Sequence, residues 1–330
     1  MSRVGAALGR SPGSPTEARP QVDPAAREVL RRLELDITRR LDGLLHGDHR
    51  GLVPGHGTEQ GETRRYSPGD DVRRIDWNVT ARLQEAHVRP TIAERELQTW
   101  LLVDRSPRIN FGTSGGTKHD LALAAAGAFG FLTNRDGNQI GAVLAGTGGN
   151  DDHGADDLVV IRPRGSRKHL LHLLTQVAAS PPADGAGVTD LGAAINHLAA
   201  ITRRRGLVVV VSDFWVMPGW EGPLAALARR HDVVAVQLTD PREFVLPNVG
   251  VITLRDPGTG HDHVVATQKA RVRRQYAQKA QERQEQIGVT LRSARVDHLL
   301  LSTERPWLDD LVRFSTQRQR RIMASSGPVL

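Results

Sequence analysis

The 330-residue sequence contains no cysteine. This absence excludes disulfide frameworks, thiolate metal sites, iron–sulfur clusters and cysteine nucleophiles. Long apolar runs are also absent, because no stretch approaches the roughly 18 apolar residues of a membrane-spanning helix. Residues 1–20 lack the apolar stretch of a signal peptide. The chemistry that remains is that of oxygen and nitrogen side chains, and we expect a cytoplasmic protein without a membrane span.

Aromatic residues are scarce, at 4% of the chain, and acidic residues are outnumbered by basic ones, 37 against 44, which gives a net charge of +7. The excess is compatible with an acidic partner or with nucleic acid. However, the positive charges are spread along the chain, and few aromatic rings are available to stack on bases. Nucleic-acid binding is therefore an alternative and not the favoured function. The hydrophobic share of 39% and the charged share of 25% are typical of globular domains.

The sequence divides into three parts. Residues 1–22 are rich in Gly, Ser, Pro and Ala without periodicity, which predicts a disordered tail. Residues 23–97 begin with an amphipathic pattern that predicts a helix over 24–46, and continue with Gly-rich text that favours short strands and turns. Because this second part has too few large apolar residues for a core of its own, we expect it to pack on the third part, residues 98–330.

The third part alternates short Val- and Leu-rich runs with helical patterns. This alternation predicts a doubly wound α/β fold, with a mostly parallel sheet and helices on both faces. A β-hairpin is expected within 249–267, closed by Pro257 and Gly258. The runs that predict the strands of the sheet cover 97–104, 139–146, 157–163, 206–213, 232–240 and 297–302.

Polar residues follow several of these strands. Asp104 and Ser106 come at the end of the first, Ser212 and Asp213 at the end of the fourth, and Thr189 precedes a predicted helix. Ligands of open α/β sheets bind at the carboxyl ends of the strands, so these side chains are expected to converge there. Their oxygen atoms are ligands that suit Mg²⁺.

The Gly-rich loop at 112–118 is a weaker candidate. It contains G-x-S-x-G, but it does not directly follow a strand, as a nucleophile elbow requires. Its end, Thr117-Lys118, also lacks the Gly-Lys-Ser/Thr of a phosphate-binding loop. We do not expect this loop to act in catalysis.

Two resemblances are carried by these motifs. The order D-x-S, T-D before a helix and S-D after a Val-rich strand resembles a von Willebrand factor A-type domain with its metal-ion-dependent adhesion site. The stretch R-x-Y-x-P-G-D-D-V-R-R-I-D-W-x-x-T-A-R at 64–82 resembles a bacterial domain-of-unknown-function family, number 58. H-V-R at 87–89, E-x-E at 94–96 and F-G at 111–112 extend this second resemblance, which covers about residues 40–320. Members of that family are often found beside MoxR-type AAA+ ATPases.

The resemblance implies that the ligands of a metal-ion-dependent adhesion site (MIDAS) correspond here to Asp104, Ser106, Thr189 and Asp213. The usual third residue of the D-x-S-x-S motif is Ser, whereas this chain has Arg108. A guanidinium can pair bidentately with a carboxylate. We therefore expect a degenerate site in which Arg108 partly replaces the ion, with Mg²⁺ binding that is weak or absent.

The block at 64–82 has its own physical interpretation. Its charges alternate in sign and its two aromatic residues supply apolar area, which favours a compact, ion-paired loop packed on the main domain. A partner-binding surface is the alternative. The residues concerned are Tyr66, Asp70, Asp71, Arg73, Arg74, Asp76, Trp77 and Arg82.

These observations favour a non-enzymatic protein-interaction module. From the resemblance we expect it to act, in a chaperone-like way, with a MoxR-type ATPase in the assembly or maturation of other proteins. One alternative is a Mg²⁺-dependent hydrolase that uses Asp104 and Asp213 to hold the ion, although no general base can be identified in the sequence. The other alternative is the nucleic-acid-binding protein considered above.

Overall fold

The computed structural model describes residues 64–67, 72, 75–88, 97–135, 138–146, 158–179 and 186–325. The tail predicted at 1–22 and the helix predicted at 24–46 lie outside these residues. Among the described helices, none is both long and apolar enough to cross a membrane.

A six-stranded sheet forms the centre of the main domain, in the order β10-β7-β6-β3-β4-β5. All neighbouring strands are parallel except β5, which pairs antiparallel with β4 at one end of the sheet. Each predicted run forms a strand, so the mostly parallel α/β architecture is confirmed. The strands are β3 (Gln98–Asp104), β4 (Gln139–Ala145), β5 (Leu158–Arg164), β6 (Leu207–Ser212), β7 (Asp232–Thr239) and β10 (Asp297–Ser302).

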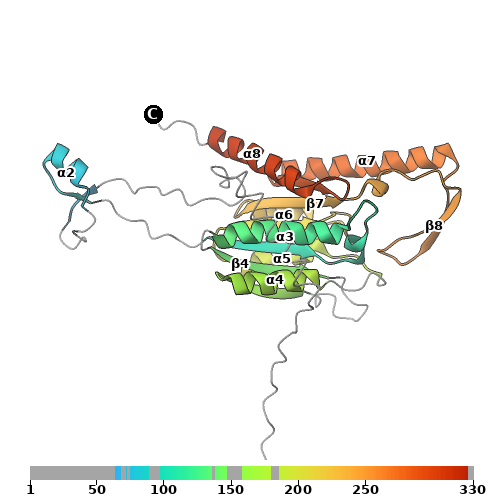
Figure 1. Ribbon diagram of the computed structural model, residues 1–330, viewed down its shortest axis with the longest axis horizontal. Helices are drawn as coiled ribbons and strands as arrows, with labels where there is room; N and C mark the ends of the chain where they lie inside the picture. The colour runs from blue at the N-terminus through green and yellow to red at the C-terminus, as the bar shows by residue number, and fades with distance from the viewer. Residues whose placement is uncertain are drawn as a thin grey trace, which may run out of the picture.

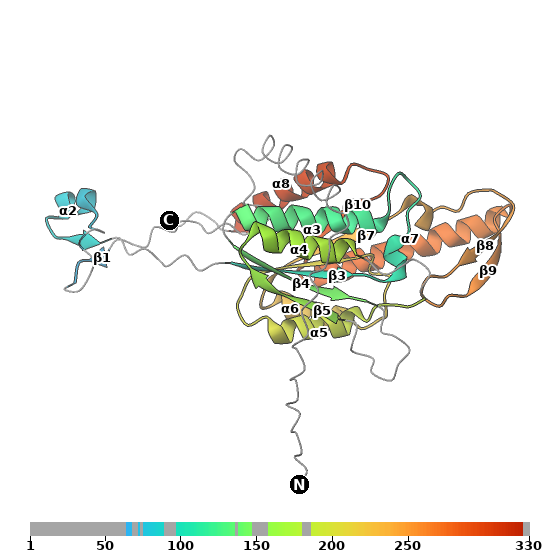
Figure 2. The same cartoon turned by 60° about the horizontal axis from the view of Figure 1, so that its bottom comes forward.

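Among the described helices, three cover each face of the sheet. On one face α3 (Lys118–Arg135) lies between α4 (Arg167–Ala178) and α8 (Trp307–Ser325), as Figures 1 and 2 show. The other face is covered by α5 (Leu191–Ile201), α6 (Glu221–Ala228) and α7 (Ala270–Ser293). Successive residues of the central strands alternate between the two layers, which is why their sequences are apolar throughout.

The order of the strands reverses at β3. Its neighbour on one side is β4, the next strand in the sequence, and on the other side β6, which comes after two further helices. Such a switch point leaves a crevice at the carboxyl ends of the two strands. The residues that follow β3 and β6 are therefore brought together by the topology.

The predicted hairpin is also present, as β8 (Val251–Arg255) and β9 (Asp262–Ala266). It lies beside the first half of α7, at the end of the molecule where the strands of the parallel sheet finish (Figures 1 and 2). The hairpin turn contacts the loop before α5, since the Gly187 amide donates to the Pro257 carbonyl oxygen at 3.1 Å. A Cβ atom at Gly258 would come within 2.8 Å of Val188, so glycine permits this close approach.

The N-terminal part contributes one small unit. Strand β1 (Arg64–Arg65) pairs antiparallel with β2 (His87–Val88), and α2 (Trp77–Leu83) lies between them in sequence. Asp76 caps α2 by accepting the amides of Asn78 and Val79. Residues 89–96, which lead to β3, are outside the described part of the chain, so the packing of this segment on the main domain stays a prediction.

Candidate functional site

The four residues that correspond to adhesion-site ligands lie at the carboxyl ends of β3 and β6 and in the loop before α5. Asp104 ends β3, Asp213 directly follows β6, and Thr189 reaches Asp104 from the loop, with its Oγ1 2.7 Å from Asp104 Oδ1. Ser106 is two residues beyond β3 and donates its backbone amide to the same Asp104 oxygen at 2.8 Å. The structure therefore brings these residues to one edge of the sheet, which we call the C-terminal edge.

Asp104 is a buried hydrogen-bond acceptor. Besides the bonds from Thr189 and Ser106, its Oδ2 accepts the hydroxyl of Ser212 at 2.8 Å. Burial raises the pKa of Asp104 above its ordinary value, and the neighbouring charge of Asp213 raises it further, while the three hydrogen bonds lower it in part. Both carboxylate oxygens are thus already engaged with the protein.

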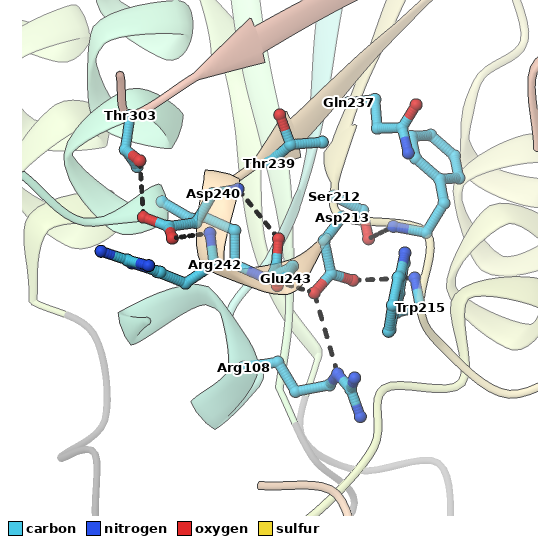
Figure 3. Close-up of polar contacts among 12 residues, drawn as sticks. Arg108, Ser212, Asp213, Trp215, Gln237, Thr239, Asp240, Arg242, Glu243 and Thr303 are labelled. Carbon is cyan, nitrogen blue, oxygen red and sulfur yellow. Dashed lines mark hydrogen bonds and ion pairs between the residues drawn. The ribbon is translucent and has the colours of Figure 1, made fainter. Parts of the chain in front are cut away.

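Asp213 is paired with a lysine that is not among the site residues predicted from the sequence. The fully buried Lys118 donates to Asp213 Oδ2 at 2.7 Å and to Glu243 Oε1 at 2.6 Å. Arg108 is farther away, with its Nε 3.8 Å from the same Asp213 oxygen (Figure 3). The expected guanidinium is present beside the carboxylate, but an ammonium at hydrogen-bond distance supplies the nearer positive charge.

The electrostatics of this ion-paired group follow from burial and pairing. Burial alone would raise the pKa of Asp213, but the Lys118 ammonium and then Arg108 hold it below its ordinary value. Burial alone would lower the pKa of Lys118, but Asp213 and Glu243 raise it instead. Burial also raises the pKa of Glu243, against the lowering effect of Lys118. Lys118 therefore remains charged among carboxylates that have little access to water.

The sequence does contain a signal that singles out Lys118. It is one of only four lysines in a chain that otherwise uses arginine, and it is the first residue of α3. A cation at that end of a helix is disfavoured by the helix dipole. A rare residue type at an unfavourable position indicates a specific partner, although the sequence does not say which one.

Glu243 is positioned by a second group of polar residues after β7. Asp240 and Glu243 form a capping box around the short helix η4 (Pro241–Glu243). Asp240 also accepts the hydroxyls of Thr113 and Thr303, each at 2.6 Å, and Figure 3 shows Asp240 between Thr303 and Arg242. The Gly-rich loop is thus anchored through Thr113, which supports a structural role for it.

The residues at the C-terminal edge fit an ammonium better than a divalent ion. One observation favours an ion, since the buried Ser106 Oγ has no hydrogen-bond partner among the described residues. Against it, the Asp104 oxygens accept protein donors and Asp213 already pairs with Lys118.

The backbone after β6 is strained where it leaves the site. Phe214 has φ of 57°, in the left-handed region that non-glycine residues rarely adopt. Its amide donates to Ser212 Oγ at 3.0 Å, and its ring packs on Trp220 at 5.1 Å between centroids. The next amide, that of Trp215, donates to Asp213 Oδ1 at 2.8 Å. These contacts hold Asp213 in place and offset the cost of the strained backbone at Phe214.

The block at 64–82 is described only in part. Asp70, Asp71, Arg73 and Arg74 lie outside the described residues. Asp76 caps α2, Tyr66 is half-buried and Arg82 is exposed. Trp77 has 70% of its surface exposed, so the described residues do not supply the packing that we expected of its ring.

Several solved structures are similar to this chain at low sequence identity. One is BatB from Bacteroides thetaiotaomicron, with a TM-score of 0.39 and 12% identity, over 68% of this chain and 99% of that one. Another is the SpRpn10 VWA domain, with a TM-score of 0.29 and 16% identity, over 44% of this chain and 76% of that one.

Mycobacterial relatives are much more similar in sequence. An uncharacterized protein of Mycobacterium tuberculosis and one of Mycobacterium bovis are each 43% identical over 302 residues, which is 92% of this chain and 92% of theirs. The family described as "Protein of unknown function DUF58" matches residues 62–286, which include the block at 64–82 and the C-terminal edge. This match and these relatives together show that the chain belongs to the DUF58 family.

Proposed function

We propose that the protein is a non-enzymatic interaction module that binds a protein partner at the C-terminal edge. The observation that carries the proposal is the pairing of Lys118 with Asp213 and Glu243. Carboxylates committed to a buried ammonium are poor general bases and poor metal ligands, so hydrolytic chemistry is disfavoured. Protein binding does not need those groups to be free.

The partner that we propose is a MoxR-type AAA+ ATPase, with which the protein acts in the assembly or maturation of other proteins. This identity comes from the family resemblance and not from any contact in the structure. Cytoplasmic location is part of the same proposal, because such ATPases need ATP.

The test uses the tagged full-length protein and its Asp104→Ala variant. Mass spectrometry of the proteins recovered from the native host should identify a MoxR-type ATPase with the wild type and much less of it with the variant. If no metal takes part in the contact between the two proteins, the wild type should still recover the ATPase in the presence of EDTA. If no AAA+ ATPase is recovered and the purified pair does not associate, the proposed partnership is wrong.

A Mg²⁺-dependent hydrolase remains the second candidate because the unpartnered hydroxyl of Ser106 offers an oxygen ligand. A panel of phosphatase and nuclease substrates with Mg²⁺ or Mn²⁺ tests it directly. Activity in the wild type that is lost in Asp104→Ala would favour the enzyme over the interaction module.

A further inference from the structure

Three adjoining hollows lie between the β8–β9 hairpin, the first half of α7 and the C-terminal edge. Their volumes are about 550, 420 and 390 Å³, and both Arg108 and Tyr276 line all three. We call the three together the basic groove. Since Arg108 and Tyr276 are common to the three hollows, they mark the place where the hollows join.

The walls of the basic groove combine positive charge with apolar surface. Apolar and aromatic lining is provided by Leu246, Leu254, Trp215 and Tyr276, among others. The cationic side chains of the lining are Arg108, Arg242, Arg255, Lys279 and Arg283.

The two carboxylates of the lining do not balance this charge. Glu243 is engaged by the buried Lys118. Asp256 accepts the Gly258 amide at 2.9 Å and the Thr259 hydroxyl at 3.1 Å, and lies 3.4 Å from Arg108 Nη1. Arg255 is also paired, with Asp262 outside the lining at 2.8 Å. The other cations of the lining, Arg242, Lys279 and Arg283, still exceed its anions, which favours an acidic ligand.

Arg108 has hydrogen-bond donors to spare. Its Nε is buried 3.8 Å from Asp213 Oδ2, too far for a hydrogen bond, and is not accessible to a ligand. Its Nη1 makes only a long contact with Asp256, at 3.4 Å, so the donors available to a ligand are those of the Nη atoms. The guanidinium lies 5.7 Å from the centroid of the Trp215 ring, which restricts its orientation. A guanidinium that is oriented but poorly satisfied is suited to receive a carboxylate through two parallel hydrogen bonds.

We propose that the basic groove binds an extended segment of a protein partner, and that Arg108 receives the carboxylate of an internal Asp or Glu of that segment. The carboxylate is internal because the hollows continue from Arg108 in more than one direction. Along α7 the lining runs from Val272 to Arg283, about 16 Å at 1.5 Å per residue. About five extended residues cover that distance. Apolar neighbours of the acidic residue pack on Leu254 and Tyr276. This inference rests on the proposed function and names the chemistry of the partner.

The test begins with a phage-displayed library of random nine-residue segments, each flanked on both sides by fixed Gly-Ser, selected on the full-length protein in EDTA. Segments with an acidic residue beside apolar residues should be enriched. A selected peptide, synthesised with both ends blocked, is then measured by fluorescence anisotropy. Replacement of its acidic residue by the amide should weaken binding about tenfold or more, as expected for a charge-assisted pair.

Variants of the protein locate the contact. Arg108→Gln should weaken binding by a similar factor, and the amide peptide should lose little further affinity on this variant, because the two changes remove the same interaction. Arg274→Gln is the matched control, since Arg274 is exposed on α7 and does not line the groove. It should change the affinity less than twofold.

Several outcomes would overturn the inference. The first is a selection that enriches no segment, or segments without an acidic residue. The second is a peptide that binds only when its C-terminal carboxylate is free. The third is a selected peptide that binds the wild type and Arg108→Gln with equal affinity. The proposed function is judged separately. If Arg108→Gln still recovers the MoxR-type ATPase although the groove binds no acidic segment, the interaction module stands and only its assigned contact is wrong.

Discussion

A buried cation from a helix lies between two carboxylates at each end of the central sheet, where its strands begin and where they finish. The two ion-paired groups differ in what they leave without a partner. At the edge where the strands begin, Arg318 of α8 pairs with Asp232, at the start of β7, and with Asp297, at the start of β10. At the C-terminal edge Lys118 pairs with Asp213 and Glu243.

The difference lies in what each cation leaves unsatisfied. Arg318 uses its planar fork on both carboxylates, and it does not line any of the three hollows of the basic groove. Lys118 neutralises its carboxylates as a point charge, and leaves Arg108 with unused donors beside the basic groove and Ser106 with an unpartnered hydroxyl. The first arrangement ties strands to a helix, whereas the second leaves buried polar atoms without hydrogen-bond partners next to the basic groove.

The largest expected effect is that of Lys118→Met. It would leave two carboxylates without their nearest counter-charge in a site with little access to water, which should lower the free energy of unfolding by about 3–5 kcal/mol. Urea denaturation measures the change. Lys168→Met, at an exposed position of α4, is the matched control and should have little effect. A loss below about 1 kcal/mol for Lys118→Met would contradict the central role of this ion pair.

Arg318→Met should have the next largest effect, about 2–3 kcal/mol. The expected loss is smaller because its partners Asp232 and Asp297 have side chains that are 34% and 24% exposed, so water can solvate them when the arginine is removed. Arg320→Met is the exposed control. Because Arg318 lies at the opposite end of the strands, its replacement should leave the affinity of the folded protein for the selected peptide unchanged. A change in this affinity would contradict the proposal that only the C-terminal edge takes part in binding.

Binding of a divalent ion should distinguish the wild type from a variant that lacks both Lys118 and Arg108. In Lys118→Met/Arg108→Ser the carboxylates lose the ammonium and the third hydroxyl of the adhesion motif is restored. If that site then binds Mg²⁺ with a dissociation constant near 0.5 mM, 5 mM Mg²⁺ should stabilise the variant by about 1.4 kcal/mol. Calorimetric titration and thermal unfolding with Mg²⁺ and Mn²⁺ should show no such binding to the wild type. Clear wild-type binding would mean that the site is a functional metal site.

The smallest effect concerns pH at the edge where the strands begin. Burial lowers the pKa of His231 below its ordinary value, as do the nearby charges of Arg230 and Arg205. The folded state therefore favours neutral His231, and its stability is complete above the unfolded pKa of about 6.5 and declines as the pH falls through that value towards the folded pKa.

The comparison of the wild type with His231→Asn, which cannot be charged, isolates this contribution. Between pH 7.5 and 5.5 the wild type should lose up to about 1 kcal/mol more unfolding free energy than the variant. The amount is small because a single group titrates and only about one pH unit of this range lies below the unfolded pKa, where one unit is worth about 1.4 kcal/mol at most. Equal losses in the two proteins would show that His231 does not contribute.

The sequence predicted the strands and the convergence of Asp104, Ser106, Thr189 and Asp213 for one physical reason. Apolar runs buried on both faces of a parallel sheet are continuous in sequence, and their carboxyl ends lie at one edge whatever the details of packing. The hairpin was predicted because its turn residues and alternating pattern are local. The family block at 64–82 was recognisable by its unusual spacing of charged and aromatic residues, although much of it lies outside the described residues.

The sequence by itself determined the fold class, the edge at which the polar residues gather and the family. Only the tertiary structure decided which cation balances Asp213. Lys118 and Glu243 are separated by 125 positions, and nothing local to either residue indicates the other. They meet because α3 begins and β7 ends at the same edge of the sheet. An ion pair depends on the distance between two side chains, which the packing of helix on sheet sets, whereas a strand depends on a pattern that is present in a few consecutive residues.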